Sequence, residues 1–473
     1  MENKRGTWGS NFGFLMAAIG SAVGLGNIWG FPFKMGANGG FAFLVIYLIL
    51  AAIVGVTVML GELTIGRKTG LSTIAAYRQL NKKHAWIGYL GLVCGFIIMA
   101  FYSVLGGVIL RYTAGYLLQL LGVDGFAGAG AGFFGAMLYE PGGMIFFHAL
   151  FMLLNILVVM GGVRGGIEKF SVFAMPALTV LLVIIIVYIA VQPGALAGYA
   201  FMFKPNFAPL REDFFKVLRT AAGQMFFSLS LGLGCMINYG SYLEKKENLQ
   251  RNALIIPIAD TIVALLAGIA VMPACAAFGV DFGAGPGLLF VSVQQVFLSM
   301  GSVGNLIGFL FYFLVLIAAI SSSISMLEIV TSHFIDRRIL KGKEPGRKKI
   351  TCIAAGVIFV IGLPVALDAL GGGGAAIKAP YELLGYTGDA IKGWCDCWLD
   401  VYDLIAEGFF MPIGALLMSL LIGWSYGTEM IRDECELCGE KFRLFGWFKV
   451  AFRIIVPIGM VVVLIGQLMS FFG

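Results

Sequence analysis

Long apolar stretches dominate this 473-residue chain and restrict it to folds that a lipid bilayer can hold. A helix needs about 20 apolar residues to cross about 30 Å of hydrocarbon. Stretches of that length fall near residues 10–34, 40–66, 86–121, 145–161, 168–192, 214–240, 252–279, 303–335, 349–367, 403–427 and 447–471. A backbone in lipid must satisfy its own hydrogen bonds, and the alternation of a barrel strand is missing. We therefore expect an all-α membrane protein with eleven transmembrane helices that contact the lipid bilayer.

Charged side chains are too few for a soluble protein of this size. They make up 12% of the residues, against about 25% in soluble domains, while 59% of the residues are hydrophobic. This composition excludes a disordered chain and a nucleic-acid partner, and it argues against a soluble enzyme. A membrane enzyme is also disfavoured, because His84, His148 and His333 lie far apart and close to the ends of predicted spans.

Basic residues in the loops predict how the spans cross the membrane. Loops after even-numbered spans carry most of the lysines and arginines, including Arg67, Lys68, Arg78, Lys82, Lys83, Arg164, Lys169, Lys245, Lys246, Arg251, the run 337–349, Arg432, Lys441 and Arg443. Cytoplasmic loops of membrane proteins are enriched in lysine and arginine. We expect a multi-pass protein of the plasma (inner) membrane, with its N-terminus in the cytoplasm and its C-terminus outside.

The first and sixth spans are interrupted by glycine. Residues 20–32 read GSAVGLGNIWGFP, and residues 228–234 read SLSLGLG. Close packing of small residues between helices would explain either motif alone. The two motifs, however, lie in the first spans of two successive five-helix halves. An unwound segment in lipid persists only where something binds the freed backbone groups, so we expect a ligand site between these spans.

These motifs resemble the neurotransmitter:sodium symporters, and in particular their bacterial amino-acid transporters. The resemblance extends over nearly the whole chain and includes residues 8–32, Gly61-Glu62, Gly66-Arg67, GGIEKFSVFAMP at 165–176, GQMFFSLSLGLG at 223–234 and AAISSSIS at 318–325. It implies a 5+5 inverted repeat with unwound helices 1 and 6. The repeats would be residues 1–192 and 193–427, and residues 428–473 would form a cytoplasmic loop and an eleventh helix.

The resemblance also implies an amino-acid site. Backbone N–H groups of Leu25 and Gly26 and the hydroxyl of Tyr102 would hold the substrate carboxylate. Gly24 stands where monoamine transporters carry an aspartate, which favours an α-amino acid over an amine. The remaining substrate-binding residues would be Ala22, Ile98, Phe227, Ser228, Ser230, Leu233, Ser322 and Met326. This mainly apolar set favours a neutral, hydrophobic or aromatic L-amino acid, and small neutral amino acids remain an alternative.

Two sodium sites follow from the same resemblance. The first would use the Ala22 carbonyl, Asn27, Ser228, Asp260 and the substrate carboxylate. The second would use the carbonyls of Gly20, Val23 and Ala318 and the hydroxyls of Ser321 and Ser322. Without the family, a serine triplet in a membrane helix would be read as packing between helices. Asp260 supplies a fixed negative charge where chloride-dependent relatives have a neutral residue, so we expect no chloride requirement.

Gates are expected on both sides of that site. The resemblance assigns the inner gate to Arg5, Trp8, Ser241, Tyr242 and Asp336. The spacing of Gly166 and Pro176 would let helix 5 unwind towards the second sodium. On the outer side, Gly30 replaces the usual basic residue, and Lys34, one turn further along, is the candidate to pair with Asp403.

The resulting hypothesis is a sodium-coupled symporter that imports its substrate by alternating access. The alternative on the same fold is a sodium-dependent amino-acid sensor, which the absence of an appended signalling domain disfavours. Cys435 and Cys438 form a CxxC motif, but no second pair completes a zinc site. Nothing in the sequence indicates an oligomeric state.

Overall fold

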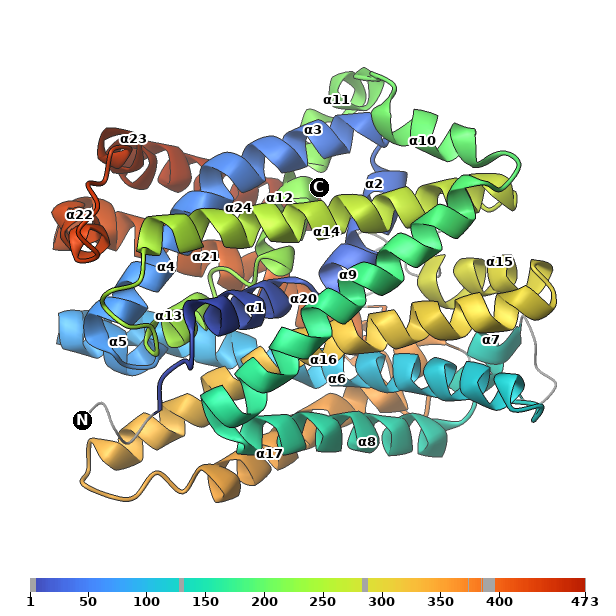
Figure 1. Cartoon of the computed structure of the whole chain (residues 1–473), viewed down its shortest axis with the longest axis horizontal. Helices are drawn as coiled ribbons and strands as arrows, with labels where there is room; N and C mark the ends of the chain where they lie inside the picture. Colours follow the sequence, from blue (N-terminus) through green and yellow to red (C-terminus); the bar gives the residue numbers. More distant parts are fainter. Residues whose placement is uncertain are drawn as a thin grey trace.

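The chain forms a bundle of membrane-length helices (Figure 1). The computed structural model describes residues 6–126, 132–282, 288–372, 374–383, 385 and 396–472, and these residues form helices, turns and loops without a β-strand. Arg5, one of the predicted inner-gate residues, lies outside the described part of the chain.

Nine helical spans in these described ranges are long and apolar enough to cross a membrane. They are Phe41–Thr69 (α3, Phe41–Leu50, and α4, Val56–Thr69), Lys82–Leu120 (mainly α6, Ala85–Leu120), Pro141–Met160 (α8), Val163–Ala190 (mainly α9, Lys169–Ala190), Leu249–Ala277 (α14), Ser302–Ile339 (α16), Arg347–Gly371 (mainly α17, Arg347–Leu367), Trp398–Tyr426 (α20, Trp398–Asp403, and α21, Met411–Leu420) and Phe445–Met469 (α23, Phe445–Val450, and α24, Val456–Phe472). Each corresponds to a span predicted from hydropathy, with ends that differ by a few residues.

The first predicted span is a bent pair of helices. Helix α1 (Asn11–Ala22) is followed by Gly26–Ala37, which consists of a π-helical turn and α2 (Phe31–Ala37), and the two parts meet at 48°. Val23 has extended backbone angles between them. At the start of α1, the Ser10 hydroxyl accepts the N–H of Gly13 at 2.9 Å, which caps the helix.

The sixth predicted span also consists of two helices, α12 (Phe214–Ser228) and α13 (Cys235–Gly240). Turns connect them through residues 229–234. Ser230, Gly232 and Gly234 all have positive φ angles, and serine rarely adopts this conformation. The Glu62 carboxylate of α4 accepts the N–H groups of Gly232 at 2.7 Å and Met236 at 3.1 Å. Glu62 therefore binds backbone N–H groups that have no partner within the helix at the start of α13.

Short helices lie between the spans. They are α5 (Thr73–Leu80), α7 (Phe133–Leu138), α10 (Ala195–Phe203), α11 (Ala208–Glu212), α15 (Val293–Ser299), α18 (Pro380–Leu383) and α22 (Glu429–Glu436). Helices α5 and α22 lie at one end of the bundle, with the start of the described chain before α1, and α7, α10 and α15 lie at the other (Figure 1). Helix α1 packs between α9, α14 and α16. Residues 23–25 are buried, as are all of residues 229–234 except the partly buried Gly232, so both chain interruptions lie inside the bundle.

Candidate functional site

The interruption between α1 and α2 is held by side chains from two other helices, α6 and α12, and by Asn27 of the broken span itself. The Leu25 N–H donates to the Tyr102 hydroxyl at 3.1 Å, and the Gln224 amide donates to the Gly26 carbonyl at 2.6 Å. The Gly24 N–H donates to Oδ1 of Asn27 at 3.0 Å. The backbone groups that leave the helix are thus bound by polar side chains, as a stable interruption in lipid requires.

A buried carboxylate lies beside this interruption. Asp260 on α14 is fully buried, and its Oδ1 accepts the Asn27 amide at 2.7 Å. Its Oδ2 accepts the Ser228 hydroxyl at 2.9 Å and lies 3.5 Å from the hydroxyl of Tyr47. The structure therefore brings together Asn27, Ser228 and Asp260, three side chains of the first predicted sodium site. Tyr47 was missed by the sequence analysis, because a tyrosine in an apolar run carries no local sign of its partner.

Serine hydroxyls of α16 reach the last carbonyls of α1. Ser322 donates to the Ser21 carbonyl at 3.0 Å, and Ser230 donates to the same oxygen at 3.0 Å. Ser321 donates to the Ala318 carbonyl at 2.9 Å and lies 3.4 Å from the Val23 carbonyl. The predicted second sodium site is therefore a compact group of hydroxyl and carbonyl oxygens. A Cβ atom on Gly20, another predicted member, would lie 3.3 Å from Cβ of Ser321.

Several predicted substrate-binding residues adjoin the interruption in the first span. A Cβ atom on Gly24 would lie 2.7 Å from the Tyr102 hydroxyl and 2.8 Å from Cβ of Ser322, so the site has no room for a side chain there. A Cβ atom on Gly26 would lie 2.9 Å from the Phe227 ring. Ala22, Ile98, Leu233 and Met326 are buried. Ile98 lies one turn before Tyr102 on α6, and Met326 lies one turn after Ser322 on α16.

Trp8 lies at the N-terminal end of the bundle, next to the end of α13. Its indole N–H donates to the Tyr239 carbonyl at 3.0 Å, and its ring packs against Tyr239 and Tyr242. Asp336 accepts the Ser72 N–H at 2.7 Å, and the Ser241 hydroxyl donates to the Asn238 carbonyl at 2.6 Å. These contacts place the described members of the predicted inner gate at one end of the bundle.

A buried ion pair lies beside Tyr242 and was not predicted. Glu328 on α16 is fully buried and accepts two hydrogen bonds from the Arg347 guanidinium, at 2.6 and 3.0 Å. The Tyr242 hydroxyl donates to Glu328 at 2.9 Å. A glutamate within an apolar span is a detectable signal by itself. Its arginine partner follows α16 by a loop and could not be identified from local sequence.

Lys34 does form an ion pair, but with Glu407 rather than with Asp403. The Lys34 ammonium lies 2.6 Å from Oε1 of Glu407, and the two side chains are 17% and 10% exposed. Asp403 lies one helical turn before Glu407. Lys34 lies one helical turn after Gly30, the position of the basic residue in the family. Its observed partner, Glu407, likewise lies one turn after the predicted partner. Glu407 replaces Asp403 as the observed partner.

The span that contains Gly166 and Pro176 is helical from Val163 to Ala190. Pro176 lies inside α9, and a Cβ atom on Gly166 would collide with the Val158 carbonyl at 1.9 Å. Glu168 accepts the Gly9 N–H at 2.6 Å, which attaches the start of this span to the start of α1. The predicted unwinding of helix 5 is not present in this conformation.

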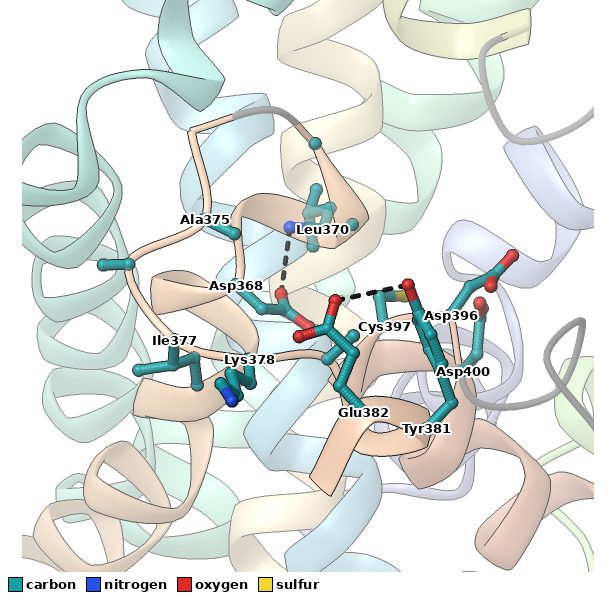
Figure 2. A pocket seen from close by; sticks show the side chains of 14 residues that line it. Asp368, Leu370, Ala375, Ile377, Lys378, Tyr381, Glu382, Asp396, Cys397 and Asp400 are labelled. Atoms are coloured by element: carbon teal, nitrogen blue, oxygen red, sulfur yellow. Dashed lines mark hydrogen bonds between the residues drawn. The ribbon is translucent and has the colours of Figure 1, made fainter. Parts of the chain in front are cut away.

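Two cavities of similar volume lie away from the chain interruptions. Figure 2 shows one of about 770 Å³, between the end of α17 and the start of α20, whose lining includes carboxylates of Asp368, Glu382, Asp396 and Asp400. Asp368 accepts the N–H of Leu370 at 3.0 Å and also that of Trp398. The other cavity, of about 790 Å³, adjoins Tyr242 and Asp336 at the N-terminal end. Neither cavity includes the residues around Asp260.

The CxxC motif lies at the end of α22. Cys435 is fully buried, and this burial raises the pKa of its thiol to about 12. The Cys438 thiol lies 3.3 Å from the Cys435 carbonyl. Cys435 is therefore packed inside this end of the bundle.

Comparison with known proteins assigns a family to this arrangement. Residues 5–124 and 135–377 match the model of the sodium:neurotransmitter symporter family. The chain is 35% identical to the uncharacterized sodium-dependent transporter YhdH of Bacillus subtilis, over 98% of this chain and 97% of that protein. It is 30% identical to the uncharacterized sodium-dependent transporter MJ1319 of Methanocaldococcus jannaschii, over 96% and 89% of the two chains.

A solved structure has the same fold. The crystal structure of MhsT in complex with L-phenylalanine matches with a TM-score of 0.86 and 34% sequence identity. The match covers 98% of this chain and 100% of that chain.

Proposed function

Because the chain belongs to the sodium:neurotransmitter symporter family, we propose that it imports a neutral, hydrophobic or aromatic L-amino acid together with sodium. The observation that carries this proposal is the group of oxygens and N–H donors where the break after α1 meets Tyr102, Asp260 and α16. The family is one of transporters rather than enzymes. The phenylalanine bound to MhsT, a structural neighbour over almost the whole chain, supports an amino-acid substrate.

The substrate carboxylate would bind at the break in the first span. The Tyr102 hydroxyl accepts the Leu25 N–H and can donate its own hydrogen to a carboxylate. The N–H groups of Leu25 and Gly26 lie at the start of the second helical part, where an anion is favoured. Because Gly24 has no side chain and no space for one, the site carries no carboxylate there to bind an amine. These features support an α-amino acid over a decarboxylated amine.

Two sodium ions would be transported with it, and hard cations prefer oxygen ligands. The first ion would bind Asn27, Ser228, Asp260, the Ala22 carbonyl and the substrate carboxylate. The second would bind Ser321, Ser322 and the carbonyls of Gly20, Val23 and Ala318. A carboxylate shared between substrate and sodium couples the two binding events reciprocally. Two charges crossing 100 mV release about 4.6 kcal/mol, which can drive accumulation of a neutral substrate.

Asp260 would also make transport independent of chloride. Its Oδ2 is surrounded by the hydroxyls of Ser228 and Tyr47, so a fixed carboxylate occupies the place where an anion would meet these donors. The buried negative charge balances the charge of the first sodium ion.

The proposed topology has eleven spans, with α1–α2 as the first and α12–α13 as the sixth. Residues 1–192 and 193–427 would form the inverted repeats, and residues 428–473 the last loop and helix. The basic loops support a topology with the N-terminal end of the bundle in the cytoplasm and the C-terminus outside. Trp8, Asp336 and the Glu328–Arg347 pair would then form the inner gate, and Lys34–Glu407 the outer gate. Alternating access would open these gates in turn.

Loss of the Lys34–Glu407 pair is expected to impair transport. Lys34→Ala and Glu407→Gln should each lower the initial uptake rate at least about threefold, because each leaves a partly buried charge without its partner. The charge-reversed double variant should recover part of the rate. Lys246→Ala removes an exposed ion pair of equal length, with Glu244, and serves as the control. Uptake by Lys34→Ala at the wild-type rate would exclude a gating role for the pair.

Uptake into proteoliposomes tests the proposed function directly. The purified protein is reconstituted and given L-phenylalanine, L-leucine or L-alanine with an inward sodium gradient, or with potassium in its place. We expect sodium-dependent uptake, fastest with the larger side chains, that persists when gluconate replaces chloride. A preference for L-alanine would shift the assignment to small neutral amino acids. Binding without uptake would favour the sensor alternative.

A further inference from the structure

Helix α8 carries two polar side chains in a part of the bundle where polar groups are costly. His148 and Asn155 are both fully buried, seven residues apart. Seven residues are two helical turns, or about 10 Å, so both side chains lie on one face of α8. Other faces of this helix expose Phe146, Leu153 and Leu157. Polar groups inside membrane helices are rare and indicate a functional role.

His148 is bound to the helix that carries Tyr102. Its Nε2 lies 2.8 Å from the hydroxyl of Ser103, the next residue after Tyr102 on α6, and the same hydroxyl donates to the Ala100 carbonyl at 3.0 Å. The imidazole packs against the Phe359 ring of α17, with 4.6 Å between ring centroids. Gly362 leaves space for it, because a Cβ atom there would lie 2.8 Å from Cε1 of His148. The imidazole is therefore held between three helices.

Asn155 is bound to the helix that carries the second sodium site. Its Oδ1 accepts the Ser323 hydroxyl at 2.6 Å, and its Nδ2 donates to the Phe151 carbonyl at 2.9 Å. Ser323 directly follows Ser321 and Ser322 on α16. Those two hydroxyls contact carbonyls of Val23 and Ser21, whereas the hydroxyl of Ser323 contacts Asn155 of α8 and the Ile320 carbonyl of its own helix. The hydrogen bond between Asn155 and Ser323 thus restrains the rotation of α16 about its own axis, at the level of the proposed second sodium site.

We propose that His148 and Asn155 are positioning residues that hold the substrate donor and the sodium ligands in register. Helices α6, α8 and α16 run side by side (Figure 1), and α8 contacts both of the others. Each polar contact involves a serine next to a site residue, with Ser103 beside Tyr102 and Ser323 beside Ser322. A buried hydrogen bond between membrane helices fixes the register that apolar packing alone leaves less specified. This inference rests on the proposed sodium-coupled transport of an amino acid.

Loss of the Asn155 contact should change the sodium dependence of uptake, and loss of the His148 contact should change the KM for L-phenylalanine. Asn155→Leu should raise the sodium concentration for half-maximal uptake about threefold to tenfold, with the KM for L-phenylalanine at saturating sodium changed less than twofold. His148→Leu should raise that KM about threefold to tenfold, with a smaller effect on the sodium dependence. His148→Gln should recover part of the loss, because its Nε2 can still donate to Ser103. Met152→Leu, at a buried apolar position of the same helix, is the control.

Variants of the partner serines keep the test decisive if a leucine variant does not fold. Ser323→Ala and Ser103→Ala each remove one oxygen and should reproduce the effects of Asn155→Leu and His148→Leu. The double variant Asn155→Leu/Ser323→Ala should be no worse than Asn155→Leu alone, since both changes remove one interaction. Equal changes in both constants, or no change in either, would overturn the inference.

Failure of the proposed function gives a different pattern. If the wild-type protein takes up no amino acid with sodium, the proposed function fails. The inference is then tested by the sodium-induced rise in Tm, because an ion that binds the folded state stabilises it. A rise that is smaller in Ser323→Ala than in Met152→Leu would still support the role of Asn155, and an equal rise would contradict it.

Discussion

Asp260→Asn is expected to abolish most sodium-driven uptake in chloride-free medium, with a loss of at least about tenfold. The Asp260 carboxylate is fully buried. It accepts hydrogen bonds from the Asn27 amide and the Ser228 hydroxyl, and the Tyr47 hydroxyl lies 3.5 Å away. Without its charge, a sodium ion beside it would have no fixed counter-charge in a medium of low dielectric. The two hydroxyls would be left to bind an anion. Chloride should therefore restore part of the uptake in the variant, whereas we expect wild-type uptake to be the same with and without chloride.

The measurement is initial uptake of L-phenylalanine in sodium gluconate and in sodium chloride. Asp433→Asn, which changes an exposed carboxylate of α22 that pairs with Arg432, is the matched control and should behave as wild type. Undiminished uptake by Asp260→Asn in gluconate would show that Asp260 neither binds sodium nor replaces chloride.

Gly24→Ala is expected to lower amino-acid affinity at least about tenfold. The added Cβ atom would lie 2.7 Å from the Tyr102 hydroxyl and 2.8 Å from Cβ of Ser322, so one of these groups must move. Added volume in a closely packed site costs about 1–3 kcal/mol, and here the displaced groups are those that would hold the carboxylate and sodium. The measurement is the affinity for L-phenylalanine at saturating sodium, together with Tm to separate binding from folding.

Gly356→Ala is the matched control for that substitution. Gly356 lies in α17, another membrane span, and a Cβ atom there would have no other atom within 4 Å. It should leave affinity unchanged. Equal affinities for Gly24→Ala and Gly356→Ala would mean that the space around residue 24 is not part of the substrate site.

Hydropathy predicts the long spans of this protein well, because crossing lipid depends on local composition. The glycine pattern located the two interrupted segments, and the structure has a 48° bend at the first and turns at the second. Short helices such as α10 and α15 lie in loops and leave no comparable signal. Their positions depend on packing against neighbouring spans.

Partners across the bundle were harder to predict than the residues themselves. Asp260 stands out because a charge in an apolar span is costly, whereas Lys34 was identified through the family resemblance, one turn beyond Gly30. The contacts of Lys34 with Glu407 and of Asp260 with Tyr47 depend on how each helix is rotated, as does the pair of Glu328 with Arg347. One helical turn separates the predicted partner Asp403 from the observed Glu407. A single sequence does not specify the rotation of each helix about its axis closely enough to choose between partners one turn apart.

We propose that the interruption in the first span binds the substrate carboxylate together with sodium. Equilibrium binding of L-phenylalanine and of phenethylamine, each measured with sodium and with potassium, tests this claim most directly. We expect sodium to raise the affinity for L-phenylalanine at least tenfold, L-phenylalanine to raise the affinity for sodium by the same factor, and phenethylamine to bind weakly in both salts. Binding of phenethylamine as tight as that of L-phenylalanine, or phenylalanine affinity that is equal in sodium and potassium, would contradict it.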